Sequence, residues 1–194
     1  MDFVVIDVET ANGRMESICQ VGIASFRKGR LAATWESRVD PEDDFSPFNI
    51  SIHGIDASQV RGAPTWAQVF PQVAARLRGR ITVSHTSFDR LALARACRRY
   101  ALPECACRWL DSARVVRHTW PRFSRSGYSL PNLAAHFGIE YRAHDALEDA
   151  RCAGWVLLRA VAETGLSPEQ WLARMEPPAG LAGRGCPKTK PSPP

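Results

Sequence analysis

The sequence has no apolar run long enough to span a membrane, and its six cysteines do not form paired CxxC motifs. The first absence argues against an integral membrane protein, and no signal-peptide pattern precedes the first apolar run. The second absence argues against a structural zinc module, because such modules usually supply their cysteines in closely spaced pairs. We therefore expect a cytoplasmic protein with reduced thiols.

Lysine is also scarce, with 3 residues against 22 arginines, yet the formal net charge is +5. A positive balance favours an anionic partner, and nucleic acid is the commonest one. Arginine suits bidentate contact with phosphate, although genome composition also enriches it. The charge is therefore compatible with nucleic-acid binding without establishing it.

The 194 residues fit one domain and a tail. We expect the domain over residues 1–175, which is long enough to bury a core without disulfides. Residues 176–194 are rich in proline and glycine and carry basic side chains. This composition predicts a disordered linker or tail.

The order of predicted elements indicates an α/β fold with a mixed sheet. Three strand patterns come first, at residues 2–10, 18–27 and 31–39, and read as an antiparallel meander. Short strands at 81–85 and 108–110 then alternate with helical patterns after Thr65, over 88–100, 129–137 and 145–164, and after Pro168. Such an order predicts helices packed on both faces of the sheet.

Two acidic residues stand near the end of the first apolar strand. Asp7 and Glu9 are two positions apart, so their side chains point to the same face. Two carboxylates there would repel each other and lose hydration, and a divalent cation removes both problems. The alternative is a strand end whose acidic side chains face solvent.

Other candidate residues follow later in the chain. Asp89 comes after the strand at 81–85, in the first turn of a helix. The helix dipole favours a carboxylate there, which is the structural alternative. The position just beyond the carboxyl end of a strand is also where α/β folds place ligands. His144 and Asp149 are five positions apart, roughly 500° of helix rotation. We therefore expect His144 on a loop and Asp149 inside the following helix. The alternatives are that Asp149 is an ordinary exposed helical acid and that His144 is a surface or capping histidine.

These segments resemble the three motifs of the DEDDh 3′–5′ exonucleases, the DnaQ-like family of the DNA polymerase III proofreading subunit. The motifs correspond to residues 5–10, 84–89 and 144–150, and their order and spacing agree over about residues 1–165. The resemblance implies an RNase H-like fold, whose sheet also begins with three antiparallel strands.

The resemblance also implies roles for individual residues. Two Mg²⁺ or Mn²⁺ ions would be held by four carboxylates: Asp7, Glu9, Asp89 and Asp149. His144 would be the general base, with His53 and His85 as rivals, and His85 is expected to be structural. Contacts with the terminal nucleotide are expected from Thr10, His53 and Phe88, although core packing is an alternative for Phe88.

The second motif departs from the family pattern. An asparagine is usual two or three residues before the aspartate, but here Ser84 and Thr86 flank His85. We expect this asparagine to order the loop and not to ligate metal. Its absence puts the substrate geometry in question, but not the metal ligands.

The implied activity is hydrolysis of DNA from the 3′ end, releasing nucleoside 5′-monophosphates, in repair or proofreading. A second interpretation is an RNase of the same superfamily that trims RNA or short oligonucleotides. A third is an interaction module tethered by its tail to a polymerase or another repair protein. The presence of all five active-site residues disfavours an inactive scaffold.

Overall fold

A computed structural model of the chain describes residues 1–175. Its centre is one five-stranded sheet with the order β3-β2-β1-β4-β5. The strands are β1 (Asp2–Thr10), β2 (Ile18–Arg27), β3 (Arg30–Arg38), β4 (Ile81–Ser84) and β5 (Arg108–Asp111). The tail expected at residues 176–194 lies outside the described part of the chain.

The sheet is mixed, as the sequence predicted. Strand β2 pairs antiparallel with both β1 and β3, whereas β4 pairs parallel with β1 and β5. The carboxyl ends of β1, β4 and β5 therefore meet at one edge of the sheet. Segments that follow these three strands are brought together there.

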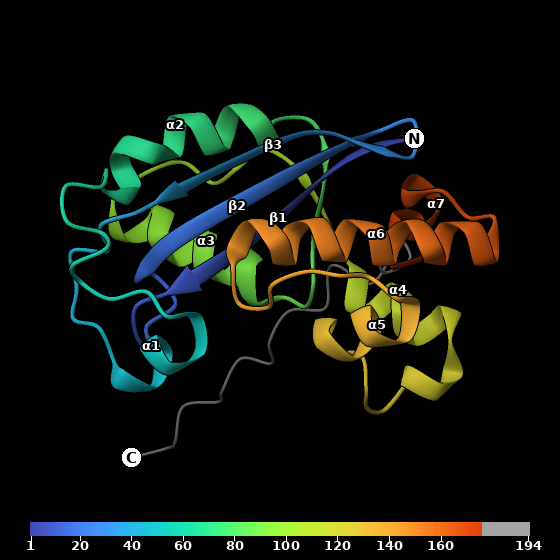
Figure 1. Ribbon diagram of the computed structural model, residues 1–194. Coiled ribbons are helices and arrows are strands. Elements are labelled where there is room, and N and C mark those ends of the chain that lie inside the picture. Colours follow the sequence, from blue (N-terminus) through green and yellow to red (C-terminus); the bar gives the residue numbers. More distant parts are fainter. Residues whose placement is uncertain (176–194) are drawn as a thin grey trace, which may run out of the picture.

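Helices cover both faces of the sheet (Figure 1). One face is covered by α2 (Trp66–Leu77) and α3 (Phe88–Arg99). The other face carries α4 (Ser112–Thr119), α5 (Leu130–Phe137), α6 (Ala146–Thr164) and α7 (Pro168–Met175). Helix α1 (Pro47–His53) lies near the end of β1.

Side chains of β1 alternate between the two cores, as expected for a central strand. Val4, Ile6 and Val8 pack with residues of α2 and α3. Phe3 and Val5 pack instead with residues of α4 to α7. The alternation places the next odd-numbered residues of β1 on the face that α6 covers.

Three elements were not predicted: α1, α4 and the 3-10 turn Pro121–Phe123. The Val-Val pair of α4 favours a strand by propensity, but the Asp111 carboxylate accepts from Arg114 N–H at 3.1 Å and begins a helix instead. Helix α1 begins in the same way, with Ser46 capping Asn49 N–H at 3.3 Å and Pro47 in its first turn. Local capping therefore begins a helix in both places.

Strand and helix ends differ from the predictions by about one residue. β3 ends at Arg38 rather than at residue 39, and β4 ends at Ser84 rather than at residue 85. Helix α6 begins at Ala146, with Asp145 as its N-cap. These shifts do not move any candidate residue to another face.

A glycine lets α6 approach the sheet closely. Gly22 of β2 pairs with Asp7, and a Cβ at Gly22 would lie 2.5 Å from the carbonyl oxygen of Ala146 and nearer still to the backbone nitrogen of Leu147. Only a residue without a side chain fits there without moving the helix. The first turn of α6 therefore rests directly on β2, beside the position of Asp7.

Candidate active site

The first two carboxylates project from β1 towards α6. Asp7 and Glu9 continue the face of Phe3 and Val5, and both are half-buried. Asp149 lies in the first turn of α6 and is 7% exposed. The close packing of α6 on Gly22 brings this third carboxylate to the first two. The two motifs therefore meet even though they are about 140 residues apart in the sequence.

Asp89 reaches the same place from the other side of the sheet. It lies in the first turn of α3, as predicted, and is 2% exposed. Its Oδ1 accepts a hydrogen bond from the N–H of Val8 at 3.0 Å. Val8 stands between Asp7 and Glu9, so this bond fixes the Asp89 carboxylate beside both. Asp89 is therefore a buried carboxylate directed at β1, in addition to standing in the first helical turn.

The four carboxylates resist ionisation together. Burial raises the pKa of Asp7 well above its usual value, and the charges of Asp89, Asp149 and Glu9 raise it further. Burial, with Asp149 and Asp89, raises the pKa of Glu9 to about 8. Burial also raises the pKa of Asp89 to about 7 and that of Asp149 to about 6. Full ionisation of the four carboxylates is therefore unfavourable without a cation to neutralise their charge.

His144 lies on the loop before α6, as the spacing between His144 and Asp149 predicted. Its φ of 62° is unusual for a residue other than glycine, and its side chain is exposed. Ligand atoms of Glu9, His144 and Asp149 all lie within 4.8 Å of one another. The strained backbone thus presents the imidazole to the carboxylates.

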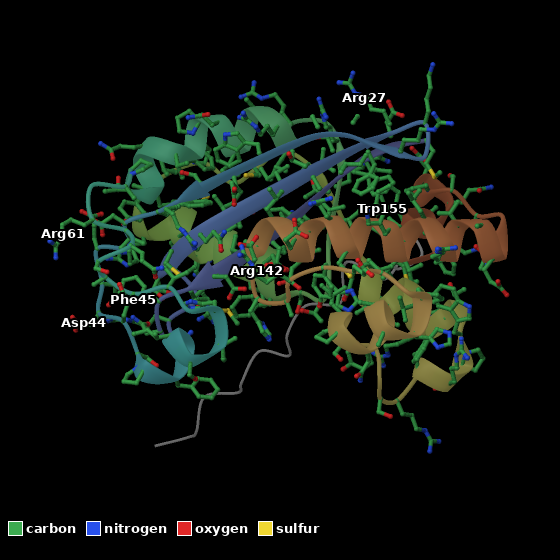
Figure 2. The ribbon with its side chains drawn as sticks, viewed as in Figure 1. Arg27, Asp44, Phe45, Arg61, Arg142 and Trp155 are labelled. Carbon is green, nitrogen blue, oxygen red and sulfur yellow. The ribbon has the colours of Figure 1, made fainter. Side chains whose placement is uncertain are left out.

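Asp145, next to His144, is buried and caps the helix that carries Asp149. It is 7% exposed and caps α6 by accepting from Glu148 N–H at 3.2 Å. It also forms an ion pair with Arg142, which lies beside the first turn of α6 (Figure 2). These contacts order the segment that carries His144 and Asp149.

The loop of the second motif is ordered without the usual asparagine. Thr86 has a φ of 88°, and its N–H donates to Asp111 Oδ1 at 3.2 Å. The Ser84 hydroxyl donates to the carbonyl of Thr86 at 2.7 Å. These two hydrogen bonds therefore order the loop, which is the role expected of the asparagine.

The rival histidines have structural partners. Nδ1 of His53 accepts from Ile55 N–H at 3.0 Å, so its Nε2 carries the proton and donates to the carbonyl of Thr10 at 3.1 Å. His85 contacts Ser112 Oγ at 2.9 Å and the carbonyl of Tyr128 at 2.6 Å. Both side chains hold backbone segments together, as expected for His85.

The residues expected to contact the terminal nucleotide differ in how exposed they are. Thr10 is 5% exposed, and its carbonyl accepts from Asn49 Nδ2 at 2.9 Å as well as from His53. This carbonyl therefore anchors α1 to the end of β1. Phe88 is 37% exposed, so the core-packing alternative for it is wrong. Its ring remains available at the start of α3, next to Asp89.

Sequence reasoning missed several residues of the site. Glu9, Gln20 and Arg38 face one another across β1, β2 and β3, and Gln20 Oε1 accepts from Ala146 N–H at 3.3 Å. Arg38 opposes the burial effect by lowering the pKa of Glu9. A glutamine within the apolar run of β2 was the one signal in the sequence, since its neighbours there are apolar.

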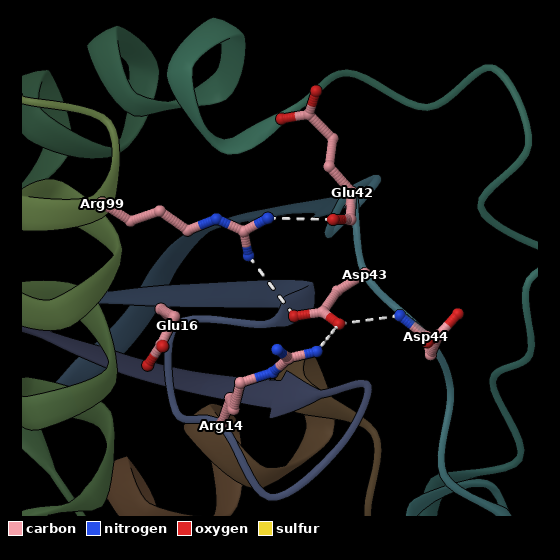
Figure 3. A pocket seen from close by; sticks show the side chains of 6 residues that line it. All are labelled: Arg14, Glu16, Glu42, Asp43, Asp44 and Arg99. Carbon is pink, nitrogen blue, oxygen red and sulfur yellow. Dashed lines mark hydrogen bonds and ion pairs between the residues drawn. The ribbon is translucent and has the colours of Figure 1, made fainter.

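A separate polar pocket of about 610 Å³ lies against the loop that leads to α1 (Figure 3). Asp43 pairs there with Arg14 and with Arg99, whose Nη1 lies 3.5 Å from the Asp43 carboxylate. Arg99 also donates to the carbonyl of Glu42 at 2.9 Å. None of the four clustered carboxylates lines this pocket, so its ion pairs serve to fix the loop.

Comparison with protein families gives one match over most of the chain. The family model described as Exonuclease (RNase_T) matches residues 4–157. Two curated relatives are DNA polymerase III PolC-type proteins. The one from Caldanaerobacter subterraneus subsp. tengcongensis is 26% identical over 162 residues, and the one from Streptococcus thermophilus is 27% identical over 159 residues. The matches cover 81% and 80% of this chain but 11% of each relative, so the chain spans about a tenth of their length.

Two solved structures share the fold. Exonuclease X in complex with 5′-overhanging duplex DNA has a TM-score of 0.72 at 22% identity, covering 88% of this chain and 98% of that one. The nuclease domain of 3′hExo, a DEDDh family member bound to rAMP, has a TM-score of 0.72 at 22% identity, covering 84% and 92%. The likeness confirms the expected RNase H-like arrangement.

Proposed function

The chain belongs to the exonuclease family, in its DnaQ-like DEDDh branch, and we propose that it hydrolyses DNA from the 3′ end with two divalent ions. The proposed products are nucleoside 5′-monophosphates, and the proposed setting is DNA repair or proofreading. The observation that carries this proposal is the convergence of four carboxylates with raised pKa values from β1, α3 and α6.

The donor set fits Mg²⁺ or Mn²⁺. These cations prefer oxygen ligands, and the cluster offers the carboxylates of Asp7, Glu9, Asp89 and Asp149. Burial and mutual repulsion disfavour their ionised forms, and a dication reverses both effects. When bound, the two ions would stabilise charge on the attacking and leaving oxygens of an in-line displacement.

The chain's own groups supply the remaining chemistry. We assign His144 as the general base that accepts a proton from the attacking water, because it is exposed and lies on a loop beside Glu9 and Asp149. His53 is a weaker candidate, since both of its ring nitrogens have backbone partners. Phe88 is assigned to stacking on the terminal bases, a contact that tolerates any sequence.

The choice of DNA rests on the relatives. The curated relatives are DNA polymerases, and Exonuclease X was solved with duplex DNA. Solved neighbours bound to rAMP or to a histone mRNA stem-loop keep RNA as the alternative substrate. For the same reason, a polymerase is the protein partner that we propose, and residues 176–194 are the proposed tether. A pull-down with a chain lacking residues 176–194 tests the tether, and retention of every partner would refute it.

The direct test is a gel assay on single-stranded DNA and matched RNA, each labelled at the 5′ end, with Mg²⁺, Mn²⁺ or EDTA. We expect a metal-dependent ladder that shortens from the 3′ end, lost in Asp7→Ala and blocked by a 3′-terminal phosphorothioate. Asp2→Ala is the matched control, because Asp2 is an exposed acid at the far end of the same strand. Full cleavage by Asp7→Ala would refute the metal assignment. A stronger ladder on RNA than on DNA would make RNA the preferred substrate.

A further inference from the structure

A hollow of about 710 Å³ lies where β4 and β5 end, at the outer edge of the sheet. This edge groove is lined by polar and aromatic side chains that include Ser87, Arg90, Arg108, Trp109 and Arg114. Ser87 directly precedes Phe88 and Asp89, so the edge groove begins at the second motif. Neighbouring strands are about 4.8 Å apart, so β5 stands about 10 Å from β1, the strand that carries Asp7 and Glu9.

The three arginines of the edge groove have no partner in the described protein. All three are exposed, and within residues 1–175 their side chains form no ion pair and no hydrogen bond. The one acidic side chain of the lining is Asp111, whose Oδ1 already accepts from the backbone N–H groups of Thr86 and Arg114. The edge groove therefore carries net positive charge and fits an anionic ligand.

Two of these arginines stand where a helix disfavours a cation. Arg90 is the third residue of α3, and Arg114 is the third residue of α4. The N-terminal end of a helix carries partial positive charge, so a cation is unfavourable there and an anion is favourable. No ion pair within residues 1–175 offsets this cost for either arginine. An anion bound in the edge groove would offset it for both.

Trp109 narrows the class of anion. It is half-buried on the edge strand β5, packs against the core beneath α2 and α3, and lines the edge groove. Arginines beside a partly exposed aromatic ring are the combination that binds single-stranded nucleic acid, because arginine contacts phosphate and the ring stacks on any base. A free phosphate ion would use the arginines but not the ring, so a nucleic-acid strand fits the lining better.

We propose that the edge groove binds the single strand of DNA on the 5′ side of the nucleotide that is removed. This inference rests on the proposed function, because it takes the 3′ end to lie at the carboxylate cluster. The strand passes from Phe88 over Ser87 to the end of β5, where Arg90 and Arg114 contact phosphates and Trp109 contacts a base. The edge groove thus determines how tightly a long substrate is held, whereas the carboxylate cluster performs the hydrolysis.

The test measures binding of a fluorescent single-stranded DNA to the full chain by anisotropy in EDTA, where no metal-dependent cleavage occurs. Each phosphate contact contributes about 0.7 to the slope of log affinity against log salt, which corresponds to about 5-fold in affinity at about 0.1 M salt. We expect Arg90→Ala and Arg114→Ala each to bind about 5-fold more weakly, with a shallower slope, and the double variant about 25-fold more weakly. Arg114→Lys should keep the slope, and the urea midpoints of the alanine variants should not fall.

The ring and the arginines are tested separately. Trp109→Leu should lower the affinity without changing the salt slope, because a stacking contact releases no counterions. An unchanged affinity in Trp109→Leu would overturn the assignment to a strand, since arginines alone bind any phosphate.

Arg30→Ala is the matched control. Arg30 is an exposed arginine at the turn between β2 and β3, at the opposite end of the sheet from the carboxyl end of β1, and its variant should bind like the wild type. Unchanged affinity in the double variant, or an equal loss in Arg30→Ala, would overturn the edge groove. Arginine-dependent binding by a wild-type chain that cleaves no DNA after addition of Mg²⁺ would support the edge groove and overturn the proposed function instead.

Discussion

Replacement of Gly22 by alanine should separate the first turn of α6 from the sheet. The new Cβ would lie 2.5 Å from the carbonyl oxygen of Ala146 and closer still to the backbone nitrogen of Leu147, whereas ordinary contact begins at 3.4 Å, so the helix must retreat by more than 0.9 Å. The obstacle is backbone, which cannot rotate away as a side chain can. Asp149, in that same turn, would move away from Asp7 and Glu9.

The expected loss of activity is large for so small a change. A misplacement of about 1 Å can lower turnover by about 100-fold, because the reacting groups no longer stand in productive geometry. Overpacking of this kind typically costs about 1–3 kcal/mol of unfolding free energy. We therefore expect Gly22→Ala to remain folded at moderate temperature but to cleave a 5′-labelled oligonucleotide about 100-fold more slowly.

Two other glycines serve as controls in the same assay. Gly13→Ala meets no atom within 4 Å and should behave like the wild type. Gly154→Ala meets the ring of Phe26, a side chain that can shift, five residues beyond Asp149 on α6. It should lose stability while keeping more activity than Gly22→Ala. Wild-type turnover by Gly22→Ala would refute the argument that the site depends on this close approach.

Three further predictions follow from the same carboxylate cluster. Asp7→Ala should abolish cleavage yet unfold in EDTA at a urea concentration at least as high as the wild type, since it relieves repulsion; a collapsed fold would contradict this. His144→Ala should slow turnover by about 10²–10⁴ while retaining Mn²⁺ binding by calorimetry, and an unchanged rate would move the base elsewhere. In EDTA, the free energy of unfolding should fall as pH rises from about 5 to about 8. The raised pKa values of Glu9, Asp89 and Asp149 make the folded chain bind more protons than the unfolded one across that window. Urea midpoints at both pH values test this, and midpoints that rise with pH would disprove it.

The sequence predicted those parts of the site that depend on periodicity. Alternation along β1 placed Asp7 and Glu9 on one face, and the five-residue spacing placed His144 on a loop and Asp149 in a helix. The mixed sheet followed from the order of strand and helix patterns. Helix α4 was not predicted, because no element was assigned to residues 112–119 and the cap that Asp111 provides was not recognised.

The residues that sequence reasoning missed act through register and packing between distant segments. Gly22 matters because it stands opposite Asp7 and beneath Ala146, and Gln20 matters because it meets the start of α6. Neither contact is marked by a local sequence pattern, because each depends on the distance between α6 and β2. Gly22→Ala should therefore weaken Mn²⁺ binding as well as turnover.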